Sequence, residues 1–136
     1  MKTADTSVLV AAFASWHEQH ELAQLEMRNV TDVIGHCALE TYSVLTRLPA
    51  PHRAPPAIVA RFISTRFSSG FLVLDPKDFR AILADLPRLG ISGGATYDAV
   101  IGATANRFGA TLLSLDRRAA QTYEACGASV ELLPAT

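Results

Sequence analysis

The sequence predicts an α/β fold built around a mostly parallel sheet. Short apolar stretches alternate with longer segments of helical periodicity, which is the pattern of repeated β-α units. Proline, glycine, aspartate and serine residues stand where one segment should give way to the next. At 136 residues the chain can bury one hydrophobic core, and we expect a single domain over 1–136.

Five short apolar stretches are the expected strands. They cover 2–5, 30–34, 71–74, 110–115 and 129–133. Because helical segments separate successive strands, neighbouring strands should run parallel, and their carboxyl ends should meet at one edge of the sheet.

Helices should fill most of the remaining chain, starting directly after the first strand. Thr6 or Ser7 can cap a helix that begins at Val8, since a hydroxyl can accept a hydrogen bond from a free N–H of the first turn. A second helix is expected over 55–67, with prolines in its first turn and Gly70 as its stop.

The second half of the chain carries equally clear helix signals. Asp75 and Pro76 form an N-cap and first-turn pair, and they open a helix that we expect Pro87 to end. A further helix is predicted over 95–108, and Gly109 should close it.

Composition excludes several classes of protein. The net charge is −1, so no overall basicity indicates nucleic-acid binding, and no apolar run approaches the roughly 20 residues that cross a bilayer. Cys37 and Cys126 lack metal-ligand spacing, and we expect both to be free thiols. We therefore expect a cytoplasmic protein that does not insert into a membrane.

One local charge bias stands out against the balanced composition. No acidic residue occurs between Glu40 and Asp75, whereas several basic residues fall there: Arg47, Arg53, Arg61 and Arg66. They could be solvated helix faces or a local phosphate-binding surface.

Four acidic residues are less easily explained as solvated charges. Asp5 and Asp116 end two predicted strands, so both point to the ligand-binding edge of the sheet. Asp98 lies in the first turn of a helix, and Glu40 has mostly apolar neighbours. Taken singly, each has a structural explanation, because the aspartates could serve helix ends and Glu40 could pair with Arg47.

Together, the four carboxylates point to metal chemistry. At one rim they would repel one another strongly unless a cation neutralised them. Oxygen ligands of this kind select Mg²⁺ or Mn²⁺, which can activate a water molecule and accept phosphate oxygens. The pattern therefore predicts hydrolysis of phosphodiester bonds.

The segments around these acids resemble the PIN-domain ribonucleases, in particular the VapC-type toxins of toxin-antitoxin modules. The similar segments are 5–9, 39–49, 97–101 and 111–118, in the family's order and roughly its spacing. The resemblance implies a three-layer α/β/α sandwich with a mostly parallel central sheet of four to five strands. It also implies an acidic pocket that binds one or two Mg²⁺ or Mn²⁺ ions and cuts RNA.

The resemblance also assigns roles to individual residues. The acidic positions are matched by Asp5, Glu40, Asp98 and Asp116; of these, Asp5, Asp98 and Asp116 would contact the metal, while Glu40 would position the attacking water. Thr6 and Ser114 match hydroxyl positions that should orient carboxylates or waters. Candidate contacts to the RNA backbone are Arg47, Arg53, Arg61, Arg66, Arg117 and Arg118.

Partners follow from the same resemblance. It implies a homodimer, a cognate VapB-type antitoxin whose C-terminal segment fills the toxin groove, and a higher toxin-antitoxin assembly. The expected substrate is RNA, such as tRNA or rRNA, and its cleavage would inhibit translation or growth.

Other functions fit the sequence less well. The His-Glu-x-His stretch at 17–20 has no third zinc ligand nearby, and no G-x-G-x-x-G motif follows the first strand. Asp75 could be the acceptor of a phosphoryl-receiver domain, but no lysine ends the last strand. A non-catalytic PIN-like module that binds RNA or protein stays open as the main alternative.

Overall fold

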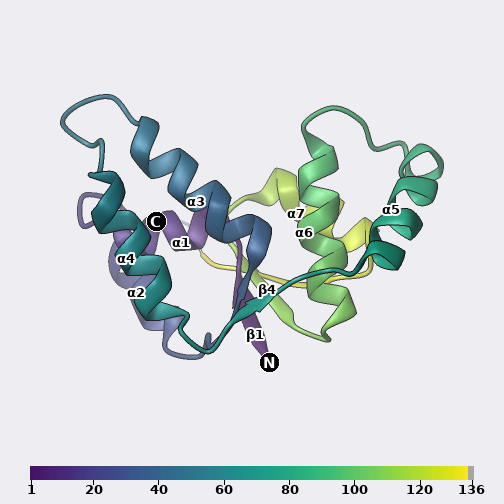
Figure 1. Ribbon diagram of the computed structural model, residues 1–136, viewed down its shortest axis with the longest axis horizontal. Coiled ribbons are helices and arrows are strands. Elements are labelled where there is room, and N and C mark those ends of the chain that lie inside the picture. The colour runs from purple at the N-terminus through teal and green to yellow at the C-terminus, as the bar shows by residue number, and fades with distance from the viewer. Residues whose placement is uncertain (135–136) are drawn as a thin grey trace.

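Parallel strands lie between two groups of helices in the computed structural model, which describes residues 1–134 (Figure 1). Three strands form one sheet in the order β1-β4-β5, with bounds Lys2–Ala4, Thr111–Ser114 and Ser129–Leu132. A second, two-stranded sheet pairs β2 (Val33–Ile34) with β3 (Phe71–Leu72).

The two sheets are neighbours across β1. An isolated parallel bridge joins Lys2 to Val30, just before β2, so the spatial order is β3-β2-β1-β4-β5. All five predicted strands are confirmed, and each is shorter than expected. The predicted continuous sheet is interrupted because the segment leading into β2 makes only this single bridge to β1.

Seven helices cover the strands within the described part of the chain. Their bounds are α1 Thr6–Phe13, α2 His20–Met27, α3 Gly35–Arg47, α4 Pro56–Arg66, α5 Pro76–Leu89, α6 Ala95–Arg107 and α7 Arg117–Ala125. In Figure 1, α1 to α4 form one group and α5 to α7 the other, with β1 and β4 between them. Helices thus lie on both sides of the strands, as a three-layer α/β/α sandwich requires.

The start of α1 differs from the prediction. The helix begins at Thr6 rather than Val8, and its N-cap is Asp5, whose carboxylate accepts a hydrogen bond from the backbone N–H of Val8. The prediction that Thr6 or Ser7 caps this helix was therefore wrong. Asp5 takes the cap because its extended backbone ends β1 and leaves its side chain facing the first turn.

The end of α5 also differs, whereas its start is confirmed. Asp75 caps the helix in a reciprocal capping box with Asp78. Pro87 does not end the helix, which continues to Leu89 and stops at Gly90, in a left-handed conformation with φ 70°. A proline in the last turn removes one backbone donor, and the few residues that follow keep their helical geometry.

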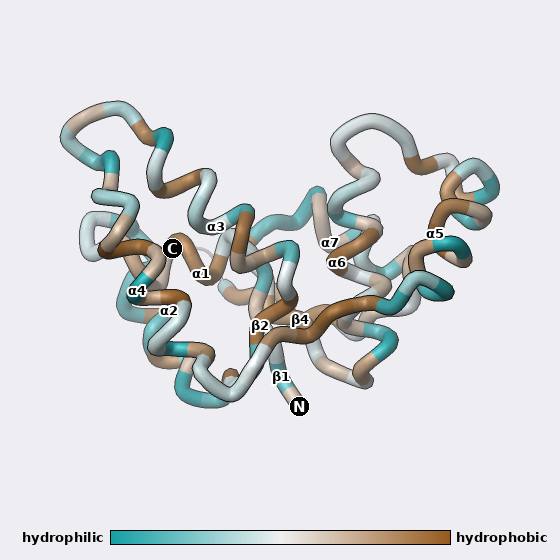
Figure 2. Tube along the Cα trace, viewed as in Figure 1, coloured by the Kyte–Doolittle hydropathy of each residue, from teal (hydrophilic) through white to brown (hydrophobic). Residues whose placement is uncertain are grey.

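The hydrophobic core surrounds the central strands, and Figure 2 shows a hydrophobic segment that runs from β3 toward α5 in front of them. The largest fully buried apolar side chains include Leu9, Ile34, Leu45, Ile101, Leu112 and Leu113. Cys37 is buried in α3 and Cys126, at the end of α7, is partly exposed; both are free thiols. None of the helices in residues 1–134 has the length and apolar character needed to cross a bilayer.

Candidate active site

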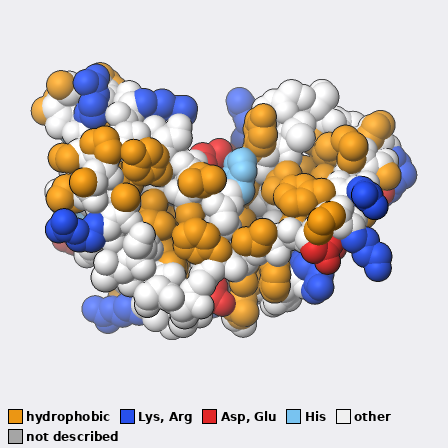
Figure 3. All heavy atoms as spheres, in the orientation of Figure 1, with side chains coloured by type: hydrophobic (Ala, Val, Ile, Leu, Met, Phe, Trp, Pro, Cys, Tyr) orange, Lys and Arg blue, Asp and Glu red, His pale blue; other side chains and the backbone are white. Residues whose placement is uncertain are grey.

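All four acids singled out from the sequence line one pocket of about 570 Å³. Asp5, Glu40, Asp98 and Asp116 reach it from separate parts of the chain. Figure 3 shows acidic side chains at the base of a notch between the two groups of helices, with basic side chains on both of its sides. The fold therefore brings together the four residues that the sequence pattern selected.

The strand topology explains how two of these acids meet. β1 and β4 are parallel neighbours, with Ala4 opposite Leu113, and the backbone N–H of Asp5 continues the pairing by donating to the carbonyl of Leu113 at 3.0 Å. Asp5 and Asp116 follow the carboxyl ends of these two strands and therefore lie at the same edge of the sheet. Asp98 comes from the first turn of α6.

Asp5 is the most enclosed of the four, with a relative exposure of 1%. Its Oδ1 accepts hydrogen bonds from Ser7 Oγ at 2.5 Å and from the Val8 N–H at 3.2 Å. Its Oδ2 accepts from Ser114 Oγ at 2.5 Å and from the Tyr123 hydroxyl at 2.9 Å. Burial raises the pKa of this carboxyl group, and the hydrogen bonds from Ser114, Ser7, Tyr123 and Val8 partly oppose the rise.

The two serines connect Asp5 to the chain around Asp116. Ser7 Oγ accepts a hydrogen bond from the Leu115 N–H at 2.9 Å, and Ser114 Oγ accepts one from the Asp116 N–H at 3.0 Å. Each serine hydroxyl therefore donates to Asp5 and accepts from the backbone that follows β4. This arrangement fixes the end of β1 to the end of β4.

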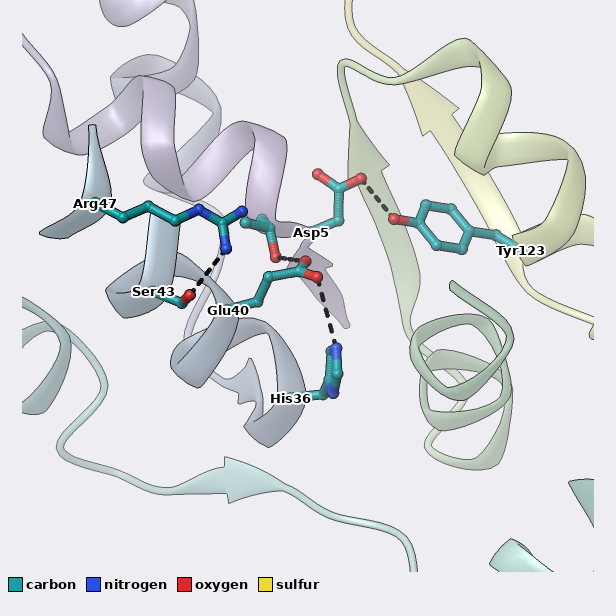
Figure 4. A network of polar contacts seen from close by, with 7 residues as sticks. Asp5, His36, Glu40, Ser43, Arg47 and Tyr123 are labelled. Atoms are coloured by element: carbon teal, nitrogen blue, oxygen red, sulfur yellow. Dashed lines mark hydrogen bonds and ion pairs between the residues drawn. The ribbon is translucent and has the colours of Figure 1, made fainter. Parts of the chain in front are cut away.

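Glu40 is held by two contacts on the wall formed by α3. Thr6 Oγ1 donates to its Oε1 at 2.5 Å, and His36 Nε2 lies 3.6 Å from its Oε2 (Figure 4). The sequence left open that Glu40 pairs with Arg47. Arg47 does not contact Glu40 and instead donates to Ser43 Oγ at 3.3 Å. The partner of Glu40 is His36, one helical turn earlier.

Asp98 experiences the other acids directly. Its pKa is raised, first by burial and then by the negative charges of Glu40, Asp116 and Asp5. Asp116 is exposed, and its carboxylate caps α7 by accepting from the N–H groups of Arg118 and Ala119 at 3.0 and 3.1 Å. The four carboxylates are thus close enough to interact.

The carboxylates are nevertheless not gathered around one point. Among residues 1–134, no three histidine, cysteine, aspartate or glutamate side chains are placed to hold one metal ion. Much of their capacity is taken by internal hydrogen bonds, as the contacts of Asp5 and Asp116 show. Binding of an ion by Asp5 would require its carboxylate to give up a hydrogen-bond partner.

The six candidate RNA-binding arginines differ in their exposure and in their contacts with the backbone. Arg47, Arg61, Arg117 and Arg118 are exposed. Arg53, although exposed, donates from Nε to the carbonyl of Leu48 at 2.8 Å. Arg66 bonds the carbonyls of Met27 and Val30, which ties α4 to the end of α2. The guanidinium of Arg66 therefore has a structural role, and its contact with RNA stays a prediction.

The histidine-rich stretch is explained by local structure. Nδ1 of His17 accepts from the Gln19 N–H at 3.0 Å, and Nδ1 of His20 lies 2.8 Å from the Ala11 carbonyl oxygen. Each ring therefore has one nitrogen engaged with the backbone, and among residues 1–134 no three metal-ligating side chains are grouped, so the structure shows no zinc site at this stretch.

Three residues of the site were missed from the sequence as partners of the acids. The spacing of His36 and Glu40, four residues apart, could have indicated their contact on one helix face. Ser7 was considered only as a cap. Tyr123 lies 118 positions from Asp5 in the chain, and no local pattern could indicate their contact.

Comparisons with known proteins agree with this fold and show the family. The family model described as PIN domain matches residues 3–125. Two relatives from Mycobacterium tuberculosis align over nearly their full lengths: Ribonuclease VapC40 is 48% identical over 133 residues, covering 98% of this chain and 99% of the relative, and Ribonuclease VapC27 is 37% identical over 128 residues, covering 93% and 92%. Among solved structures, FitAcB from Neisseria gonorrhoeae superposes with a TM-score of 0.68 at 17% identity, over 96% of each chain.

Proposed function

This chain belongs to the PIN-domain family and is a VapC-type member of it, and on that premise we propose that it is a metal-dependent endoribonuclease. It would hydrolyse RNA phosphodiester bonds as the toxin of a toxin-antitoxin pair. The observation that carries the proposal is the single pocket lined by Asp5, Glu40, Asp98 and Asp116.

The chemistry of the donor set fits Mg²⁺ or Mn²⁺. All four acids are oxygen donors, and the pKa of Asp98 is raised partly by the charges of the other three, which is a repulsion that a cation would relieve. Asp5, Asp98 and Asp116 would hold one or two ions, with Glu40 beside them. A bound ion of this kind polarises the scissile phosphate and lowers the pKa of a coordinated water.

The residues around the acids orient the reacting groups. Thr6 and His36 hold Glu40 at the pocket, where its carboxylate can accept a hydrogen bond from the attacking water. Ser7 and Ser114 fix the orientation of Asp5. No side chain needs to form a covalent intermediate, because water is the nucleophile.

The remaining parts of the proposal concern binding partners. Exposed Arg47, Arg117 and Arg118 would bind the phosphates of RNA, with tRNA or rRNA as the substrate class. The chain would act in the cytoplasm as a homodimer, neutralised by a cognate VapB-type antitoxin. The full-length similarity to proteins named Ribonuclease VapC supports RNA as the substrate and a toxin-antitoxin partner.

Cleavage of RNA by the purified chain, free of antitoxin, is the direct test. Wild-type protein with Mg²⁺ or Mn²⁺ should cut total RNA at discrete positions, and Asp98→Asn should lower the rate about a hundredfold or more, because it removes a charge that the metal requires. Asp85→Asn is the matched control, since Asp85 is an exposed acid paired with Arg88 at 3.3 Å, outside the pocket. RNA binding without cleavage by the wild type would favour the non-catalytic alternative.

A further inference from the structure

The carboxylate of Asp5 has no oxygen lone pair left for a metal ion. An ionised carboxylate offers about four acceptor positions in its plane. Four donors occupy them, two on each oxygen: Ser7 Oγ, the Val8 N–H, Ser114 Oγ and the Tyr123 hydroxyl. A cation that binds Asp5 must therefore displace one of these donors.

Three of the four donors are also fixed by other parts of the structure. The N–H of Val8 belongs to the first turn of α1, and losing its bond to Asp5 would uncap the helix. Ser7 and Ser114 each also accept a hydrogen bond from the backbone after β4, at 2.9 and 3.0 Å. Moving either serine away from Asp5 would break two hydrogen bonds instead of one.

Tyr123 differs from the other donors. Within residues 1–134 its hydroxyl makes one hydrogen bond, to Asp5 Oδ2 at 2.9 Å, while its ring is buried at 2% exposure. The side chain lines the acidic pocket together with Asp98 and Asp116. Figure 4 shows the ring pointing from its helix toward Asp5, on the opposite side from Glu40 and His36.

The packing of α7 on α6 sets the position of this ring. A Cβ atom on Gly102 would lie 2.7 Å from the Cα and 3.0 Å from the carbonyl oxygen of Tyr123, so only glycine permits this approach. Gly102 lies one helical turn after Asp98 on α6. The helix that carries one acid therefore also seats the tyrosine that contacts another.

We propose that Tyr123 is a placeholder for the cation: its hydroxyl occupies an acceptor position of Asp5 Oδ2 that a divalent ion would need, and this hydrogen bond is released when the ion binds. This inference rests on the proposed function, because it concerns how the same pocket is loaded. Tyr123 is then a positioning residue that acts through Asp5. It keeps the buried carboxylate hydrogen-bonded in the metal-free protein, and it lowers the affinity for the ion.

Calorimetric titration of the metal-free protein with Mn²⁺ tests the placeholder role. In Tyr123→Phe no hydrogen bond has to be broken before the ion binds Asp5, so the dissociation constant should fall about tenfold. A residue that merely supported the pocket would weaken binding when altered. Tyr97→Phe is the matched control, since Tyr97 is 57% exposed and has no hydrogen bond to an acid among the described residues; its affinity should equal that of the wild type.

Each outcome of this titration decides the inference. The inference is supported if Tyr123→Phe binds Mn²⁺ more tightly than the wild type and Tyr97→Phe does not. This includes the case in which binding by the wild type is too weak to measure. Equal or weaker binding by Tyr123→Phe overturns the placeholder role and leaves the metal-dependent nuclease standing. Absence of binding in both proteins overturns the placeholder and the metal site together.

A spectroscopic measurement covers the case in which Tyr123→Phe does not fold. The chain has three tyrosines, so the double variant Tyr42→Phe/Tyr97→Phe keeps Tyr123 as the single tyrosine. Addition of Mg²⁺ should change the tyrosine absorption of this variant and saturate together with calorimetric binding, because the hydroxyl loses its carboxylate partner. Binding of Mg²⁺ without any change in that absorption would overturn the inference.

Discussion

Replacement of Gly102 by alanine should destabilise the protein, although alanine is the better helix former. The added Cβ would lie 2.7 Å from Tyr123 Cα, well inside the roughly 3.5–4.0 Å separation at which carbon atoms pack. Because the opposing atoms belong to the backbone of α7, no side-chain rotation relieves the contact. The two helices would have to separate by about 1 Å.

The magnitude follows from two opposing effects. Overpacking of this kind costs about 2–3 kcal/mol when the neighbour cannot rotate away. Exchange of glycine for alanine inside a helix returns about 1 kcal/mol. The free energy of unfolding should therefore fall by about 1–2 kcal/mol, which lowers the melting temperature of a chain of this length by roughly 4–7 °C.

Gly94→Ala is a matched control for this measurement. Gly94 precedes α6 with φ −62° and ψ −28°, and a Cβ there would meet nothing within 4 Å. Thermal and urea denaturation should show Gly94→Ala at least as stable as the wild type, because alanine restricts the unfolded chain. Should Gly102→Ala match or exceed the stability of Gly94→Ala, the close approach of α6 and α7 would be refuted.

Two further predictions concern Asp98 and Arg66. The pKa of Asp98 is raised above its ordinary value of 3.8. Between these two pKa values the metal-free fold binds a proton that the unfolded chain has released, so ionised Asp98 lowers the stability of the fold at any pH above the raised pKa. Metal-free Asp98→Asn should therefore melt higher than the wild type at neutral pH, with a difference that shrinks as the pH falls toward about 4; a difference independent of pH would contradict the repulsion. Arg66→Met should lose about 1.5–3 kcal/mol of stability, because it removes charge-assisted hydrogen bonds to the carbonyls of Met27 and Val30. Arg61→Met, an exposed position on the same helix, should keep its stability, and equal melting of the two arginine variants would argue against the structural role of Arg66.

Sequence reasoning located Asp5 and Asp116 because parallel topology alone determines where they go. Once Asp5 and Asp116 follow two neighbouring parallel strands, their placement at one edge does not depend on side-chain detail. The exact cap of α1 does depend on such detail. Asp5, Thr6 and Ser7 are all good capping residues, and only the local backbone decides which one accepts the hydrogen bond.

The contacts between distant residues lay outside the reach of the sequence. Tyr123 reaches Asp5 because Gly102 allows α7 to approach α6, a relation that involves three separate elements. Arg66 was grouped with the RNA-binding arginines because a charge bias along the chain carries no information about which guanidinium meets a free carbonyl group. Both cases depend on tertiary packing and not on local propensity.

The fold partly compensates the charge of the acidic pocket. Asp5 and Asp116 are N-caps of α1 and α7, and Asp98 lies in the first turn of α6, so three of the four acids lie at helix N-termini, where the helix dipole stabilises negative charge. Glu40 lies further along α3, away from a helix N-terminus. Its carboxylate is stabilised instead by its contacts with Thr6 and His36.

This compensation is unequal among the three aspartates. Burial raises the pKa of both Asp5 and Asp98. Asp5 has four hydrogen bonds that oppose the rise, whereas the pKa of Asp98 is raised further by the other three charges, and only His36 opposes it. The uncompensated repulsion is therefore concentrated at Asp98. Because a cation stabilises most the charge that has least support, we expect Asp98→Asn to weaken metal binding more than Asp116→Asn does, and titration of both variants with Mn²⁺ would measure the difference.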